Sequence, residues 1–205
     1  MRAIVIRLPL LLAALIVGAC SEVQSVMAPK GAQASRLTEL SWVLFVGGTI
    51  ILLAVMALTA AALSRRDGVP SYLGREQAVI WGGLVFPVVT LTVLLIYGLL
   101  VTRVGALPAG SADALRVHVA GELWWWRVTY TAPDGQRIES ANELRIPVGR
   151  TVEIALRSDN VIHSFWVPNL AGKLDVIPGR TNVLRLSASE PGTSRGQCAE
   201  CCGGA

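Results

Sequence analysis

Two long uncharged apolar runs constrain this chain more than any other feature of its sequence. They span Leu40–Leu63 and Ala78–Val101, and neither contains a charged residue. Each run is long enough to cross the ~30 Å hydrocarbon core of a bilayer as a helix. Pro87 lies inside the second run, and membrane helices tolerate proline better than soluble helices do. The sequence therefore predicts a transmembrane helical hairpin over residues 40–103.

The segment between the two runs, residues 64–77, predicts how the hairpin is oriented. It carries Arg65, Arg66 and Arg75 close to the apolar runs. Short basic loops stay on the cytoplasmic side of a membrane. We therefore expect both outer ends of the hairpin, and everything after Arg103, on the periplasmic side of a bacterial inner (plasma) membrane.

A third and shorter apolar stretch begins after Arg2 and ends in Val17-Gly18-Ala19-Cys20. A basic start, a short apolar core and small residues at the end are typical of a secretory signal. The residues before Cys20 also resemble a bacterial lipobox. Residues 1–19 are thus predicted to be a lipoprotein-type signal peptide, with Cys20 as the lipid-bearing mature N-terminus and 20–39 as an outer segment. The alternative is a buried cysteine in an uncleaved anchor.

The second half of the chain has a different pattern. Hydrophobic residues make up 53% of the sequence and charged residues 16%, against about 25% charged in soluble domains, and the apolar excess lies in the first half. After a linker at 104–112, apolar residues alternate with polar ones, as in half-buried strands. Strands are predicted around Leu115–Val119, Trp124–Tyr130, Val152–Leu156 and Val183–Leu186. A small antiparallel β-sandwich over 113–205 is expected.

The cysteines indicate a metal site. Three of the four crowd into five residues, as Cys198, Cys201 and Cys202, whereas a disulfide framework would spread them over the domain. Two thiolates four residues apart, combined with His163, favour copper over magnesium or calcium. Zinc competes for the same donors, but structural zinc sites mostly pair two cysteine knuckles and only one exists here. The net charge is +4, and the sequence has no basic block with interleaved aromatic residues. The charge therefore does not indicate binding to nucleic acid.

Two motifs together resemble subunit II of the haem–copper cytochrome c oxidases, and the likeness runs from the first helix to the end. They are the His-Ser-Phe-Trp-Val-Pro stretch at His163–Pro168 and the Cys-x-Glu-x-Cys-Gly stretch at Cys198–Gly203. The resemblance implies a cupredoxin-like sandwich that holds a dinuclear copper centre, CuA. Its copper ligands would be His163, Cys198, Cys202 and the backbone carbonyl of Glu200, whose side chain would bind magnesium.

The resemblance also implies a function. Trp124 matches the indole at which cytochrome c docks, whereas strand alternation suggests that Trp126 lies in the core. Residues 173–175 and 178–180 match an interface with the haem subunit. The expected protein is the subunit through which electrons enter an aa3-like cytochrome c oxidase. It would take electrons from cytochrome c and pass them to the haem-bearing subunit I, which reduces oxygen to water. Subunit I and the other oxidase subunits would be its partners. It would not be catalytic alone.

The sequence departs from the family pattern at three places. The family has a second histidine four residues after the second cysteine and then a methionine, which would fall just beyond Ala205, so the site is expected to be cut short. Cys201 replaces a bulky apolar or aromatic residue and is interpreted as a bystander thiol; the alternatives are that it competes for the metal or forms a disulfide. Glu76 is either part of a proton path or an interfacial charge, and His118 has no assigned role.

Two alternative functions stay open. One is a copper-deficient subunit II of a quinol oxidase, although the retention of His163, Cys198 and Cys202 argues against it. The other is a truncated membrane lipoprotein with a structural or copper-carrying role.

Overall fold

The computed structural model describes residues 22–63, 75–105, 115–132 and 134–203. The predicted signal peptide, Cys20 and most of the predicted loop and linker lie outside these residues. The chain divides into two compact units. One comprises residues 1–35 together with 107–205, and the other comprises residues 36–106.

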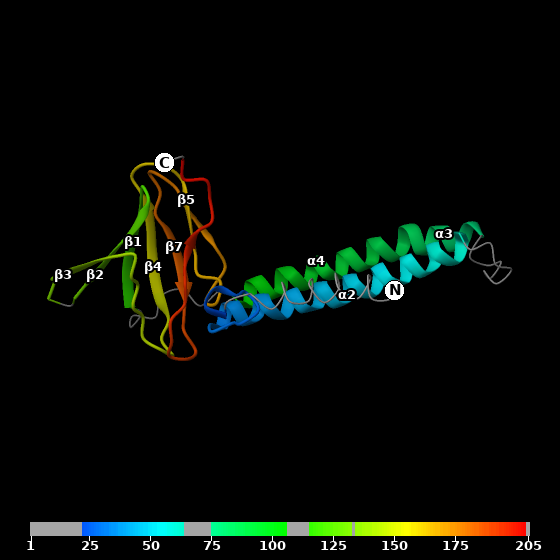
Figure 1. Cartoon of the computed structure of the whole chain (residues 1–205), viewed down its shortest axis with the longest axis horizontal. Coiled ribbons are helices and arrows are strands. Elements are labelled where there is room, and N and C mark those ends of the chain that lie inside the picture. The colour runs from blue at the N-terminus through cyan, green and yellow to red at the C-terminus, as the bar shows by residue number, and fades with distance from the viewer. Residues whose placement is uncertain (1–21, 64–74, 106–114, 133, 204–205) are drawn as a thin grey trace, which may run out of the picture. The chain divides into compact units, whose positions relative to one another are not determined.

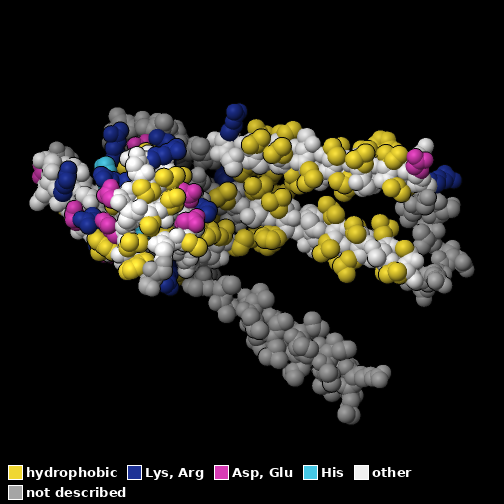
Figure 2. Space-filling view, turned by 90° about the horizontal axis from the view of Figure 1, so that it is seen from above, with side chains coloured by type: hydrophobic (Ala, Val, Ile, Leu, Met, Phe, Trp, Pro, Cys, Tyr) yellow, Lys and Arg dark blue, Asp and Glu magenta, His cyan; other side chains and the backbone are white. Residues whose placement is uncertain are grey.

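The helical unit contains two helices that are long and apolar enough to cross a membrane, Ala32–Leu63 and Glu76–Arg103. The first is α2 (Ala32–Leu63). The second combines α3 (Glu76–Ile80), the π-helical turn η3 (Trp81–Val85) and α4 (Phe86–Gly105). Apolar side chains are spread along the visible surface of both helices, with other side chains and backbone between them (Figure 2).

Polar groups inside these helices find partners within the helix. Thr59 Oγ1 donates to the carbonyl of Val55 at 2.8 Å, and Thr92 Oγ1 donates to the carbonyl of Val88 at 2.7 Å. The π-helical turn ends at Val85, two residues before Pro87, which lacks an N–H and whose ring would clash with a carbonyl of a regular helix. The wider turn accommodates the proline without ending the helix, so this apolar run forms one continuous helix that is long enough to cross a membrane.

The β unit is built from two sheets (Figure 1). The five-stranded sheet has the order β3-β2-β1-β4-β7, and the three-stranded sheet has the order β6-β5-β8. The strands are β1 (Leu115–Glu122), β2 (Trp125–Thr131), β3 (Arg137–Ala141), β4 (Val152–Ser158), β5 (His163–Trp166), β6 (Leu174–Val176), β7 (Asn182–Leu186) and β8 (Gln197–Cys198).

The predicted fold class, a helical hairpin followed by a β-sandwich, is confirmed with one correction. The sandwich is not wholly antiparallel, because β1 pairs in parallel with β4. A parallel pair needs a long crossover connection. Here β2, β3 and the segment that follows them supply it between Glu122 and Val152.

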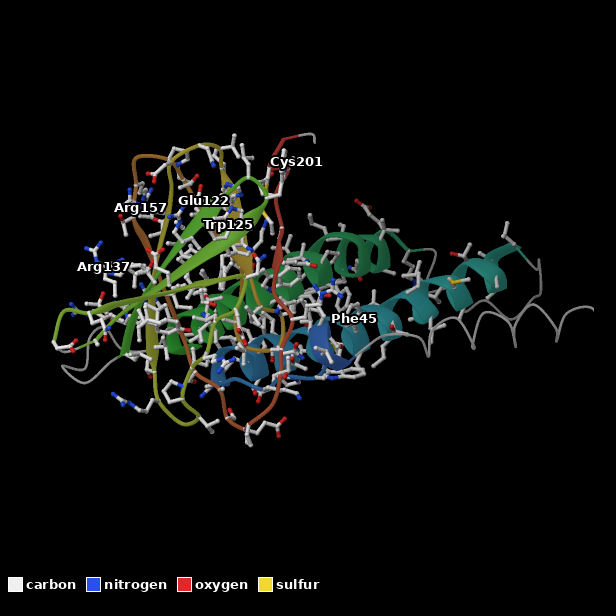
Figure 3. All side chains as sticks on the ribbon, turned by 60° about the vertical axis from the view of Figure 1, so that its left-hand side comes forward. Phe45, Glu122, Trp125, Arg137, Arg157 and Cys201 are labelled. Carbon is white, nitrogen blue, oxygen red and sulfur yellow. The ribbon has the colours of Figure 1, made fainter. Side chains whose placement is uncertain are left out.

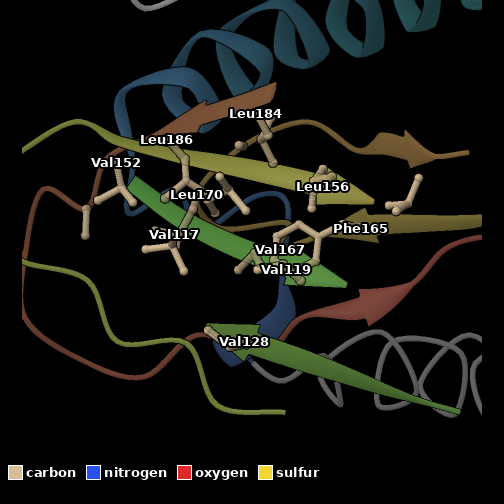
Figure 4. Packing of buried hydrophobic residues seen from close by; sticks show 14 residues of the cluster. Val117, Val119, Val128, Val152, Leu156, Phe165, Val167, Leu170, Leu184 and Leu186 are labelled. Carbon is tan, nitrogen blue, oxygen red and sulfur yellow. The ribbon is translucent and has the colours of Figure 1, made fainter. Parts of the chain in front are cut away.

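The core of the β unit lies between the sheets (Figure 4). Every second residue of β1 and β4 points into it, so that Val117, Val119, Ile154 and Leu156 are completely buried. The three-stranded sheet contributes Phe165, and the loops contribute further apolar residues. This alternation is the pattern from which the sequence predicted the strands, and it anchors the scaffold under the cysteine loop.

The segment that precedes α2 packs on the β unit. The amide of Lys30 donates to the carbonyl of Asn169 at 2.7 Å, and the amide of Ser189 donates to the carbonyl of Lys30 at 2.7 Å. The amide of Arg195 donates to the carbonyl of Val23 at 2.9 Å. The N-terminal segment therefore connects the loop after β5 to the segment that leads into β8 and the cysteine loop.

Candidate metal centre

The three-stranded sheet brings together residues that are far apart in the sequence. His163 is the first residue of β5, and Cys198 is the last residue of β8. The two strands pair antiparallel with Phe165 opposite Cys198. One further bond, from the amide of Ala199 to the carbonyl of Ser164 at 2.9 Å, holds the start of the cysteine loop against β5. This pairing fixes His163 beside the thiols.

The loop from Cys198 to Cys202 folds back on itself so that its two outer thiols meet. Their Sγ atoms lie 2.7 Å apart. The carbonyl oxygen of Glu200 lies 3.3 Å from Cys202 Sγ and 3.9 Å from Cys198 Sγ. His163 Nδ1 lies 3.9 Å from Cys198 Sγ. The ligand atoms of His163, Cys198 and Cys202 all lie within 4.8 Å of one another, close enough to hold one metal centre.

Three neighbours fix the imidazole of His163, which is only 2% exposed. A Cβ added to Gly121 on β1 would lie 2.5 Å from His163 Cδ2, so only glycine leaves room for the ring there. Trp126 on β2 meets the ring edge to face, with 5.7 Å between centroids. Asn160 Oδ1 lies 2.9 Å from His163 Nε2. The opposite ring nitrogen, Nδ1, is thereby left on the side of the thiols.

Burial governs the protonation of the cluster in the metal-free protein. It lowers the pKa of His163, against a smaller raising effect from the charge of Glu122. Burial, followed by the hydrogen bond with Cys198, raises the pKa of Cys202 to about 11. The imidazole is therefore neutral and the Cys202 thiol is protonated at neutral pH. A metal would have to displace that thiol proton on binding.

The donor set fits copper. Two cysteine sulfurs and one neutral imidazole are soft or borderline ligands of the kind that copper and zinc prefer. The amide of Ser164 also donates to Cys198 Sγ at 3.5 Å, a contact that stabilises a thiolate. Magnesium and calcium, which prefer oxygen donors, do not fit this cluster.

The other predicted site residues that the structure describes are exposed. Trp124 is 63% exposed and follows β1 in the turn to β2 rather than lying within a strand. Its neighbour Leu123 is exposed as well. Cys201 is exposed (Figure 3), and its backbone amide donates to Glu200 Oε1 at 3.2 Å. Its thiol does not belong to the group that could hold a metal ion.

Two residues that shape the site were not singled out in the sequence. For Gly121 a weak signal exists, because a glycine next to or inside a strand often marks a close approach of another part of the chain. The contact of Asn160 with His163 has no clear signal in the sequence, because the orientation of a turn side chain depends on the fold.

Fold and site together define a class: a β-sandwich protein with a helical hairpin and a Cys/His centre suited to a soft metal. Residues 128–205 match the family model described as Cytochrome C oxidase subunit II, periplasmic domain. The chain is 31% identical to a cytochrome c oxidase subunit 2 of Alkalihalophilus pseudofirmus over 185 residues, or 85% of this chain and 53% of the relative. The chain is therefore similar to cytochrome c oxidase subunit II, over the β unit by the family model and over 85% of its length by this relative.

Other comparisons cover a smaller part of the chain. A cytochrome c oxidase subunit 2 of Thermostichus vulcanus is 45% identical over 103 residues, which cover 49% of this chain and 30% of the relative. The chain thus spans about half, or less, of the length of these curated relatives. The solved periplasmic domain of subunit II of cytochrome oxidase of Bradyrhizobium japonicum is 30% identical, with a TM-score of 0.43, over 47% of this chain and 79% of that structure.

Proposed function

We propose that this chain is the subunit through which electrons enter a bacterial cytochrome c oxidase of the aa3 type. The observation that carries the proposal is the convergence of His163, Cys198 and Cys202 within 4.8 Å at the edge of a rigid sandwich. The similarity to cytochrome c oxidase subunit II supports it. A quinol oxidase subunit without copper would have no need for all three ligands.

The copper-holding residues in this proposal are the side chains of His163, Cys198 and Cys202, together with the backbone carbonyl of Glu200. When bound, a dinuclear copper centre would supply one-electron redox chemistry shared over both thiolates. The exposed carboxylate of Glu200 would bind magnesium at the boundary with subunit I. The fixed imidazole and the paired strands β5 and β8 would keep the ligands in place during electron transfer, which keeps the reorganisation small.

The docking of cytochrome c would use Trp124. Its indole is 63% exposed and lies next to the exposed Leu123, and β1, which precedes this turn, carries Gly121 against the imidazole of His163. An exposed aromatic surface beside a buried metal ligand is what a transient electron-transfer partner needs. Electrons would pass from there to the haem groups of subunit I.

The membrane arrangement follows the same proposal. The two apolar helices would cross the inner membrane with the loop 64–77 in the cytoplasm and the β unit in the periplasm. Cleavage before Cys20 and its lipidation would add a second anchor. An unmodified Met1 terminus on the mature protein, detected by intact mass, would exclude that lipid.

The test is made on the product of the complete gene, purified within its oxidase. Replacement of a proposed ligand, in His163→Ala or Cys198→Ser, is expected to abolish copper binding, while Cys201→Ser retains it. Full copper content in either ligand variant would contradict the proposed centre.

The docking role has its own matched pair. Trp124→Phe should slow electron transfer from reduced cytochrome c at unchanged copper content. Trp125→Phe is the control, because Trp125 packs under the guanidinium of Arg127, 5.2 Å from the ring centroid, rather than on the metal side. Equal rates of electron transfer in the two variants would show that cytochrome c does not dock at Trp124.

A further inference from the structure

Asn160 lies in the turn between β4 and β5, and its amide oxygen lies within hydrogen-bonding distance of three polar groups near the metal centre. Oδ1 lies 2.7 Å from the backbone nitrogen of Val161, 3.0 Å from Ser158 Oγ and 2.9 Å from His163 Nε2. Ser158 is almost completely buried. Its hydroxyl also accepts from the amide of Asn160 at 3.3 Å and lies 2.6 Å from the carbonyl of Val161. The side chain of Asn160 is thus held on several sides.

These contacts determine which way the amide of Asn160 faces. A backbone N–H can only donate, so the side-chain atom that receives the bond from Val161 must be the oxygen. The same oxygen faces His163 Nε2 at 2.9 Å. Since a carbonyl oxygen only accepts, Nε2 must carry the hydrogen. A neutral imidazole has a single N–H, and therefore Nδ1 carries the lone pair.

Nδ1 is the ring nitrogen that faces the cysteines, 3.9 Å from Cys198 Sγ. The packing contacts of the ring cannot produce this arrangement by themselves. Gly121 and Trp126 confine the plane of the imidazole, but a ring turned by half a rotation has nearly the same shape. Only a hydrogen-bond acceptor at a fixed place distinguishes the two orientations.

We propose that Asn160 is a positioning residue of the metal centre, which fixes the orientation and tautomer of His163 so that its Nδ1 lone pair points at the thiol pair. This role rests on the proposed function in so far as His163 is a metal ligand. Outer-shell partners of this kind orient ligating histidines, and their loss typically costs about 10–100-fold in metal affinity.

A purely structural role in the turn predicts different results, and the chain offers variants that separate the two. Asn160→Ala removes the acceptor. Asn160→Asp keeps an acceptor oxygen at the same place and is the conservative rescue. Asp159→Asn is the matched control, because the neighbouring carboxylate of Asp159 instead pairs with Arg157 at 2.9 Å at the surface.

The first measurement is made on the metal-free, reduced full-length protein in detergent micelles, by 15N NMR of the histidine rings. The sequence has two histidines, so His118→Gln assigns the signals. We expect His163 to be a single Nε2–H tautomer in the wild type, in Asn160→Asp and in Asp159→Asn. In Asn160→Ala the signals should broaden or average. A wild type with hydrogen on Nδ1, or an Ala variant with the wild-type signals, overturns the proposal.

The second measurement is the affinity for Cu(I), by competition with a chelator. Asn160→Ala should bind about 10–100-fold more weakly, while Asn160→Asp and Asp159→Asn stay within about threefold. An Ala variant that loses thermal stability but keeps its affinity would show a turn role only and overturn the proposal. His163→Ala is the reference. If it binds copper like the wild type, the proposed function fails, whereas the NMR result for the ring still stands.

Discussion

The glycine under the metal ligand gives the sharpest quantitative prediction. In Gly121→Ala, the new Cβ would lie 2.5 Å from Cδ2, 2.8 Å from Cγ and 3.2 Å from Cβ of His163. Carbon atoms in contact prefer about 3.5–4.0 Å. The imidazole and the strand that carries Gly121 must therefore separate by about 1 Å, because the closest contacts are to the body of the ring rather than to a flexible end.

The displacement can be absorbed in two ways, with different consequences. If the imidazole moves, Nδ1 shifts by far more than the ~0.2 Å that metal–ligand distances tolerate, and copper affinity should fall about 100-fold or more. If the strands separate instead, overpacking should lower the free energy of unfolding by about 1–3 kcal/mol. Trp126 on the next strand and Asn160 beyond the ring leave the imidazole little free space, so we expect both effects.

The assay combines Cu(I) affinity with urea unfolding of the metal-free protein. Gly48→Ala is the control, because no atom lies within 4 Å of an added Cβ at that position. It should match the wild type in copper affinity. A Gly121→Ala protein with both wild-type copper affinity and wild-type stability would refute the reasoning that this glycine makes room for the ligand.

Three further predictions concern the N-terminal segment and the protonation of the site. Asn169→Ala removes two buried hydrogen bonds to carbonyls of that segment, of 3.0 and 2.8 Å, and should cost about 1–3 kcal/mol in urea unfolding; Asn182→Ala, which loses one exposed bond, should cost less than about 0.5 kcal/mol. In the reduced, metal-free protein at pH 8, iodoacetamide should modify the exposed Cys201 well before Cys202, whose pKa is raised to about 11; equal rates by peptide mass spectrometry would contradict this. The pKa of His163 is lowered from 6.5 on folding, so below about pH 6.5 the unfolded chain binds a proton that the folded chain does not, and metal-free stability should fall as the pH decreases. His163→Gln should flatten that slope in urea midpoints measured between pH 7.5 and 5.5.

The strands that could be predicted from the sequence are those with one buried face. β1 and β4 alternate buried and less buried residues along their length, and this alternation is visible in the residue types. β5 shows no alternation, because its first three residues are all buried. β3 is almost wholly exposed, and β8 has only two residues. These strands exist because neighbouring strands pair with them, which local sequence does not encode.

The helices were predictable for a different reason. A long uncharged apolar run can satisfy its backbone polar groups in lipid only as a helix, so composition alone was enough for α2 and α4. The start of α2 at Ala32 rather than near Leu40 was not visible in the same way. The residues before the apolar run are mixed in polarity, and the helix begins directly after the tightly packed Gly31. A Cβ at that glycine would lie 2.6 Å from two carbonyl oxygens of the β unit.

The sequence by itself determined the chemistry of the centre, since the spacing of Cys198 and Cys202 and the motif at His163 define a set of soft ligands. Only the tertiary structure decided how that chemistry is held. The pairing of β5 with β8 brings the imidazole to the thiols, and Gly121 and Asn160 fix its position from strand β1 and the turn after β4. The physical reason is that a ligand's identity belongs to one residue, whereas its orientation depends on contacts between segments that are distant in the chain.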